Sequence, residues 1–159
     1  MTQEKRPQKL ELVFEKWGRL TATLLWDKAP KTCEAIVEGL PVTADCLHAQ
    51  YAGSEFYFED FPTDKKIPFE NTTCRSVNYL LTNKIDGGVL AFFVNPKVLS
   101  FCIVYGELVP RRTVEQEIEL NMFAEIDDKD EAKRIGEKGR REGPGAVTIR
   151  ILDSFSAGK

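Results

Sequence analysis

The chain alternates apolar and polar residues in short runs, and this pattern constrains its fold more than any other feature. Leu10, Leu12 and Phe14 alternate with polar residues near the start, and the segment 143–155 shows the same alternation near the end. A period of two residues is typical of a strand that buries one face. Turn residues such as the Asp86-Gly87 pair separate these runs and favour tight hairpins. The pattern therefore predicts a mainly β protein with antiparallel neighbouring strands.

The sequence predicts eight or nine strands and two helices. One helix is expected over 27–41, with Asp27 as its N-cap, and the other over 127–143, capped by one of its first two aspartates. The strands are expected in segments 10–14, 20–24, 42–51, 56–60, 77–83, 88–95, 99–105, 121–126 and 143–155. Many short strands joined by turns favour a closed antiparallel β-barrel. We expect a single domain over 1–159, with its core at about 8–153.

Charge and hydropathy exclude several classes of function. The 159 residues include 22 basic and 25 acidic side chains, for a net charge of −3. Nucleic-acid-binding proteins usually present a basic surface, so we expect no nucleic-acid partner. No run approaches the roughly 18 apolar residues of a membrane-spanning helix, so we expect no membrane partner. Residues 1–14 lack the apolar core of a secretory signal, which predicts a cytoplasmic protein.

The four cysteines predict free buried thiols. Cys33, Cys46, Cys74 and Cys102 are more than ten residues apart and form no C-x-x-C pair. Structural zinc sites usually pair their ligands at a spacing of two to four residues. We therefore expect no metal site, no cofactor and no disulfide framework.

His48 is the only histidine and the first candidate for chemistry. A histidine is the side chain whose ordinary pKa lies nearest neutrality, so it suits proton transfer. We predict that His48 lies on a strand near a hairpin end, where a barrel opens. Tyr105, before Gly106, ends another predicted strand, and its hydroxyl would reach the same opening. For both residues the alternative is a packed side chain with a purely structural hydrogen bond.

A polar loop of about sixteen residues follows the predicted hairpin and supplies further candidates. Loops of this length in compact domains tend to be functional or disordered. Glu70 would orient the imidazole of His48 or act as a base, and Asn71 would donate a hydrogen bond to a ligand. Arg75 would attract a carboxylate ligand. The alternatives are a turn stabilised by the Asn71 side chain and a solvated Arg75.

Three segments resemble known families. The segment 20–41, "LTATLLWDKAPKTCEAIVEGLP", resembles the opening of a cyclophilin, in which a strand runs into "D-x-A-P-K-T" and a helix. The chain is more similar to a bacterial family of unknown function with a cyclophilin-like barrel. That family's "H-A-x-x-x-G-E"-like hairpin corresponds to His48–Glu55, and its "P-x-E-N-x-T" loop to 68–73. The resemblance implies a cyclophilin-like barrel, and the matched motifs include His48, Glu55 and Glu70.

One departure from the cyclophilin pattern bears on activity. Cyclophilins that isomerise prolyl bonds use an arginine in a strand segment like "F-H-R-x-I", whereas the corresponding segment here reads "ADCLHAQYAG". Rotation about the peptide bond has a barrier of about 18–20 kcal/mol, and a groove that merely binds proline would lower it little. We therefore do not expect efficient prolyl isomerase activity.

The sequence favours a small-molecule-binding protein. The predicted ligand is a small polar carboxylate, amide or cyclic imide, which the protein would bind, hydrolyse or isomerise with His48 and Glu70 as catalytic residues. The predicted ligand-binding residues are Asn71, Arg75, Tyr105 and Glu55. A non-catalytic homodimeric interaction protein is the alternative. Ser54 follows Gly53, but the sequence shows no base for it, so serine chemistry is not predicted.

Overall fold

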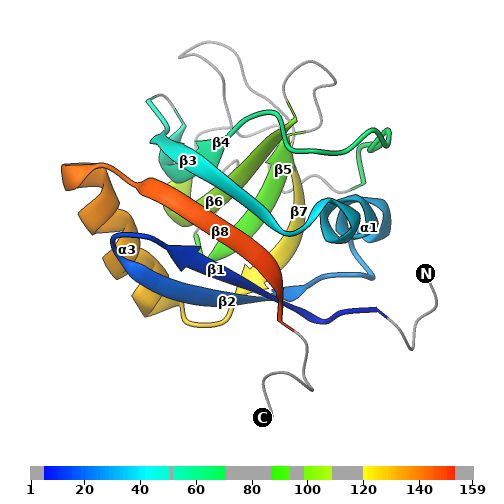
Figure 1. The fold of residues 1–159 in the computed structure, drawn as a ribbon, viewed down its shortest axis with the longest axis horizontal. Helices are drawn as coiled ribbons and strands as arrows, with labels where there is room; N and C mark the ends of the chain where they lie inside the picture. Colours follow the sequence, from blue (N-terminus) through cyan, green and yellow to red (C-terminus); the bar gives the residue numbers. More distant parts are fainter. Residues whose placement is uncertain (1–5, 51, 71–86, 94–98, 109–119, 153–159) are drawn as a thin grey trace, which may run out of the picture.

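The structure is a closed antiparallel barrel of eight strands with a helix at each end (Figure 1). It is a computed structural model that describes residues 6–50, 52–70, 87–93, 99–108 and 120–152. The strands are hydrogen-bonded in the order β1-β2-β7-β5-β6-β4-β3-β8, and β8 closes the barrel on β1. The predicted fold class, a mainly β barrel with two helices, is confirmed.

The elements follow the predicted pattern closely within the described residues. The strands are β1 (Lys9–Phe14), β2 (Gly18–Leu24), β3 (Val42–His48), β4 (Gly53–Phe58), β5 (Val89–Phe93), β6 (Ser100–Leu108), β7 (Leu120–Ile126) and β8 (Gly145–Leu152). The helices are α1 (Pro30–Gly39) and α3 (Lys129–Glu142). The strand predicted at 77–83 lies outside the described residues.

β6 is longer than predicted. We expected Gly106 to end this strand, but β6 continues to Leu108. The pairing of β4 with β6 shifts register here, because Gly53 pairs with Leu108 whereas Glu55 pairs with Val104. Three β6 residues therefore lie opposite the single residue Ser54. This irregularity is of the β-bulge type. Such bulges redirect side chains and are common next to active sites.

Aromatic side chains fill the inside of the barrel. The rings of Phe58 and Phe101 stack with centroids 5.2 Å apart, and Phe61 meets Phe92 edge-on at 5.7 Å. All four side chains are buried. The interior of an eight-stranded barrel is just wide enough for side chains to fill. The described residues therefore make the barrel interior a packed core, and a ligand would have to bind at an end or on the outer face.

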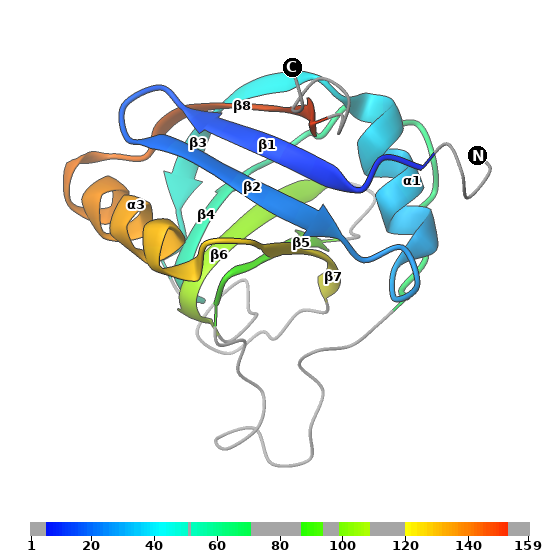
Figure 2. The same cartoon turned by 90° about the horizontal axis from the view of Figure 1, so that it is seen from below.

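The two helices lie at opposite ends of the barrel (Figure 2). Asp128 caps α3 by accepting a hydrogen bond from the Glu131 backbone N–H at 3.0 Å, as predicted. The predicted cap of α1 is wrong: its N-cap is Ala29, and Asp27 makes no capping bond. A residue distant in sequence supplies the acceptor instead, as described below. Neither helix within the described ranges is long and apolar enough to span a membrane.

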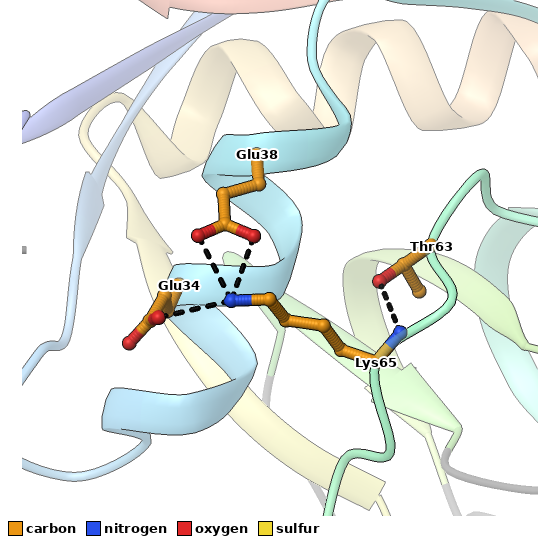
Figure 3. A network of polar contacts seen from close by, with 4 residues as sticks. All are labelled: Glu34, Glu38, Thr63 and Lys65. Atoms are coloured by element: carbon orange, nitrogen blue, oxygen red, sulfur yellow. Dashed lines mark hydrogen bonds and ion pairs between the residues drawn. The ribbon is translucent and has the colours of Figure 1, made fainter.

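A lysine ties the segment after β4 to α1 (Figure 3). The Lys65 Nζ lies 3.0 Å from a Glu34 oxygen and 2.7 Å from a Glu38 oxygen. Exposed ion pairs contribute little to the stability of a fold, so the main effect of this contact is to fix the position of the segment after β4 against α1. Gly39 lets the same segment pack closely on α1. A Cβ at this position would lie 2.5 Å from the Phe61 ring, which is too close for a side chain.

Candidate functional site

The structure separates two residues that the sequence analysis placed together. His48 ends β3 and contacts Tyr105, whose ring packs on α3. Glu70 contacts Lys31 and Thr32 at the start of α1. Because α1 and α3 lie at opposite ends of the barrel (Figure 1), the prediction that His48 and Glu70 share one rim is wrong. Asn71 and Arg75 lie outside the described residues.

Glu70 caps α1 from outside the helix. Its carboxylate accepts hydrogen bonds from the backbone N–H groups of Lys31 and Thr32, at 2.9 and 2.6 Å, and from the Thr32 hydroxyl at 2.6 Å. The first N–H groups of a helix have no partner within the helix and favour a negative charge. The backbone N–H of Glu70 donates in turn to the buried side chain of Asn121 at 2.9 Å. The described contacts therefore give Glu70 a structural role.

The substitution Glu70→Ala should destabilise the fold by about 1–2 kcal/mol, because it removes the acceptor for α1. Asp27→Ala is the matched control, since Asp27 is exposed and makes no capping bond. We expect the control to remain within about 0.5 kcal/mol of the wild type. Urea unfolding measures both. Equal losses for the two variants would contradict the capping role.

His48 and Tyr105 do come together, at the end of the barrel that α3 covers. The Nε2 atom of His48 lies 2.7 Å from the Tyr105 hydroxyl, and its Nδ1 atom lies 2.7 Å from the Ala49 carbonyl. A carbonyl oxygen can only accept, so Nδ1 carries the proton. In the neutral ring Nε2 then accepts from the Tyr105 hydroxyl. Burial raises the pKa of Tyr105, and a hydrogen bond with Ser54 partly opposes that shift.

Two glycines of α3 make room for aromatic rings of the barrel. A Cβ at Gly136 would lie 2.1 Å from the Tyr105 ring, and a Cβ at Gly139 would lie 2.2 Å from the Phe56 ring. Carbon atoms cannot approach so closely, so both helix positions require glycine. We call Gly136 and Gly139 the α3 notch. The notch seats Tyr105 with its hydroxyl toward His48.

The outer face of β4, β6, β5 and β7 carries a second apolar layer. One row runs in register across these strands from Tyr57 to Cys102, Ala91 and Met122. We call the layer the outer cluster; it comprises Ala52, Val89, Ala91, Cys102, Val104, Leu108 and Leu120, with Ala49, Tyr57, Phe93 and Met122 packed against it. Its centre is buried, and Tyr57, Phe93 and Met122 are partly exposed. The outer cluster thus approaches the surface along these three side chains.

Glu55 is a carboxylic acid in this apolar surrounding. It pairs with Val104 across β4 and β6 and is 7% exposed. Burial raises the pKa of Glu55 to about 8, and a hydrogen bond with the Cys102 thiol offsets only part of that effect. Burial also raises the pKa of Cys102 well above its usual value, and the nearby Glu55 charge adds to the shift. Both groups are therefore neutral at pH 7.

The sequence analysis missed Cys102 as part of a site. We predicted free buried thiols, and Cys33, Cys46 and Cys102 are free and buried; Cys74 lies outside the described residues. The alternation in β4 already puts Glu55 and Tyr57 on the face opposite Phe56 and Phe58. Only the register of β4 with β6 brings Cys102 to that face. Within the described ranges, no three His, Cys, Asp or Glu side chains are arranged to hold a metal ion.

A comparison of the sequence with known protein families identifies the family of this chain. A family described as "Protein of unknown function (DUF3830)" matches residues 15–101, which is more than half of the chain. The chain belongs to the DUF3830 family. The predicted membership of a family of unknown function with a cyclophilin-like fold is thereby confirmed. No curated protein matches the sequence.

Solved structures place this DUF3830 protein among cyclophilin-like folds. McbB in complex with tryptophan superposes with a TM-score of 0.63 at 18% identity, over 89% of this chain and 44% of McbB. The hypothetical protein AF2241 from Archaeoglobus fulgidus gives 0.57 at 18% identity, over 96% of this chain and 100% of its own. The Mimivirus cyclophilin gives 0.54 at 14% identity, over 100% and 96%. The chain spans less than half of McbB, and these identities show the fold alone.

Proposed function

We propose that this DUF3830 protein binds a small carbonyl-containing molecule at the outer cluster, with Glu55 as the hydrogen-bond donor. The observation that carries this proposal is the Glu55 carboxyl, which is 7% exposed beside the mainly apolar outer cluster. Burying a carboxyl group costs free energy, and buried groups with strongly perturbed pKa values gather at functional sites. Small-molecule sites are mostly apolar with a few well-placed polar groups.

The neutral carboxyl of Glu55 and the side chains of the outer cluster indicate which class of ligand would bind. A neutral carboxylic acid donates a hydrogen bond to the carbonyl oxygen of an amide, a cyclic imide or a carboxylate. The small side chains of Ala91 and Cys102 lie between the larger Tyr57 and Met122 in the same row. Because Ala91 and Cys102 are buried, a flat apolar group would contact the cluster at its half-exposed edge, along Tyr57, Phe93 and Met122. McbB, which shares this fold over 44% of its chain, was solved in complex with tryptophan, and this supports the choice of tryptophan as a probe.

Calorimetric titration with tryptophan, indole-3-acetamide and succinimide tests the proposal. Glu55→Gln keeps an N–H donor and should keep binding, whereas Glu55→Leu should weaken it by about 3- to 10-fold, the value of one hydrogen bond. In the wild type, affinity should fall as the pH rises above about 8, where Glu55 loses its proton. Glu55→Gln should lose that pH dependence.

Glu59→Gln is the control, because Glu59 is an exposed acid just after β4. It should leave affinity and its pH dependence unchanged. If none of the three probes binds, or if Glu55→Leu binds as tightly as the wild type, the proposal is wrong.

The sequence analysis also predicted catalysis on the ligand, a homodimer and a cytoplasmic location. These remain predictions, because ligand binding at the outer cluster requires none of them. Leu47 is 56% exposed and pairs with Tyr57 at the edge of the outer cluster, which favours the homodimer as the alternative function. Neither β3 nor β4 contains an arginine, so we do not propose prolyl isomerase activity.

A further inference from the structure

We propose that Arg19 and Arg150 bind an acidic segment of a partner protein on the outer face of β1, β2 and β8. Both arginines contact the buried carboxylate of Glu11, from the strands on either side of β1. In the strand order, this face lies across the barrel from the outer cluster on β4, β6, β5 and β7. A partner bound here would therefore be independent of a ligand at Glu55.

The Glu11 carboxylate holds both guanidinium groups in place. Glu11 lies on the face of β1 opposite to Leu10 and Leu12 of the core, yet its side chain is only 2% exposed. The Arg150 Nε and Nη atoms lie 2.6 and 2.5 Å from one Glu11 oxygen, and an Arg19 Nη atom lies 3.1 Å from the other. Because the two groups are already fixed, they lose less conformational entropy when they bind another anion.

The charges of this site are unbalanced. We call Glu11, Arg19 and Arg150 the Glu11 cluster; it holds two positive charges and one negative charge. The other ion pairs of the described residues give each basic side chain an acid of its own: Lys9 with Asp127, Lys65 with Glu34 and Glu38, Arg134 with Glu131, and Arg140 with Glu137. One missing negative charge matches a carboxylate, whereas a phosphate group carries about −1.5 to −2 at pH 7.

Both arginines have hydrogen-bond donors left for such a carboxylate. The side chains of Arg19 and Arg150 are 68% and 59% exposed. A guanidinium has five N–H donors, and Glu11 takes only some of them. Among the described residues, neither arginine has a second acidic partner. Arginine binds carboxylates through two parallel hydrogen bonds, so the free Nη groups are suited to a carboxylate that approaches from solvent.

The surroundings of the Glu11 cluster favour a protein segment over a free small molecule. Small-molecule sites are usually concave, whereas this face is the outside of a sheet, and the two helices lie at the ends of the barrel (Figure 2). Val13 pairs with Arg19 across β1 and β2 and is 36% exposed. A partner segment with an acidic residue next to an apolar residue would match Arg19 and Val13.

A titration with hexa-aspartate, followed by NMR of the arginine Nε–H groups, tests the proposal. The signals of Arg19 and Arg150 should shift together, and the affinity should fall at high salt. Arg19→Gln should weaken binding by about 10-fold, the value of one charged hydrogen bond. Arg150 still pairs with Glu11 in this variant, so the spectrum should remain that of the folded protein. Arg140→Gln is the matched control, because Arg140 is a half-exposed arginine with its own acid, and it should leave the affinity unchanged.

Three further probes separate the alternative ligands. Hexa-asparagine has the same length without the charge and should cause no shift. Acetate at the same carboxylate concentration, and inorganic phosphate, should shift the two signals less than hexa-aspartate does. No shift with hexa-aspartate, equal affinity for the wild type and folded Arg19→Gln, or a response to hexa-asparagine, acetate or phosphate as large as that to hexa-aspartate would overturn the proposal.

Discussion

Gly136→Ala should destabilise the protein by about 2–3 kcal/mol, although alanine favours a helix interior over glycine by about 1 kcal/mol. The reason is steric, because the new methyl group would lie 2.1 Å from the Tyr105 ring. Either α3 must move away from the barrel or Tyr105 must leave its position. Urea unfolding measures the loss in free energy.

Two further variants separate this contact from helix propensity. Lys138→Ala, on the exposed side of α3, should change stability by no more than about 0.5 kcal/mol. In the Tyr105→Ala background, Gly136→Ala should cost much less, because the ring that it meets is gone. If Gly136→Ala stabilises the wild type, the notch does not seat Tyr105.

Wild type and Glu55→Gln should differ in the pH dependence of their stability. The native state holds a proton on Glu55 up to about pH 8, whereas the unfolded chain releases it near pH 4.5. Between these values the unfolded state binds fewer protons, so the free energy of unfolding falls as the pH rises. The slope from one group cannot exceed about 1.4 kcal/mol per pH unit. Glu55→Gln removes this slope.

Urea unfolding at several pH values from 4.5 to 9 follows the difference between the two proteins. The stability of the wild type should decline relative to Glu55→Gln across the window and level off above about pH 8. Glu59→Gln should parallel the wild type, because Glu59 is exposed. Parallel curves for the wild type and Glu55→Gln would mean that the carboxyl ionises normally in the folded protein.

Local pattern predicted the elements well. Alternation located β1, β2 and β8, and the acidic start and basic end of α3 matched its dipole. The α3 notch was less visible, since Gly136 and Gly139 look like weak points in a helix until the rings opposite them are known. The same limit applies at Gly106, which breaks no strand because β6 accommodates a bulge there.

Closure of the barrel determines which residues distant in sequence meet, and the local sequence pattern could not predict this. The motifs around His48 and Glu70 were found, but their meeting depended on which barrel end each segment reached. Asn121 and Thr32 draw Glu70 to α1, far from the β3 end that holds His48. For Glu55, alternation gave the correct face, yet its burial depends on the layer formed with β5, β6 and β7.

The central claim is that Glu55 is a neutral acid at physiological pH, held on the outer face of the barrel to donate to a ligand. The most direct test is a ¹³C NMR titration of the Glu55 carboxyl carbon, assigned by comparison with Glu55→Gln. We predict a midpoint near pH 8 that rises when a carbonyl ligand binds. A midpoint near 4.5, the ordinary value for glutamate, would contradict the claim.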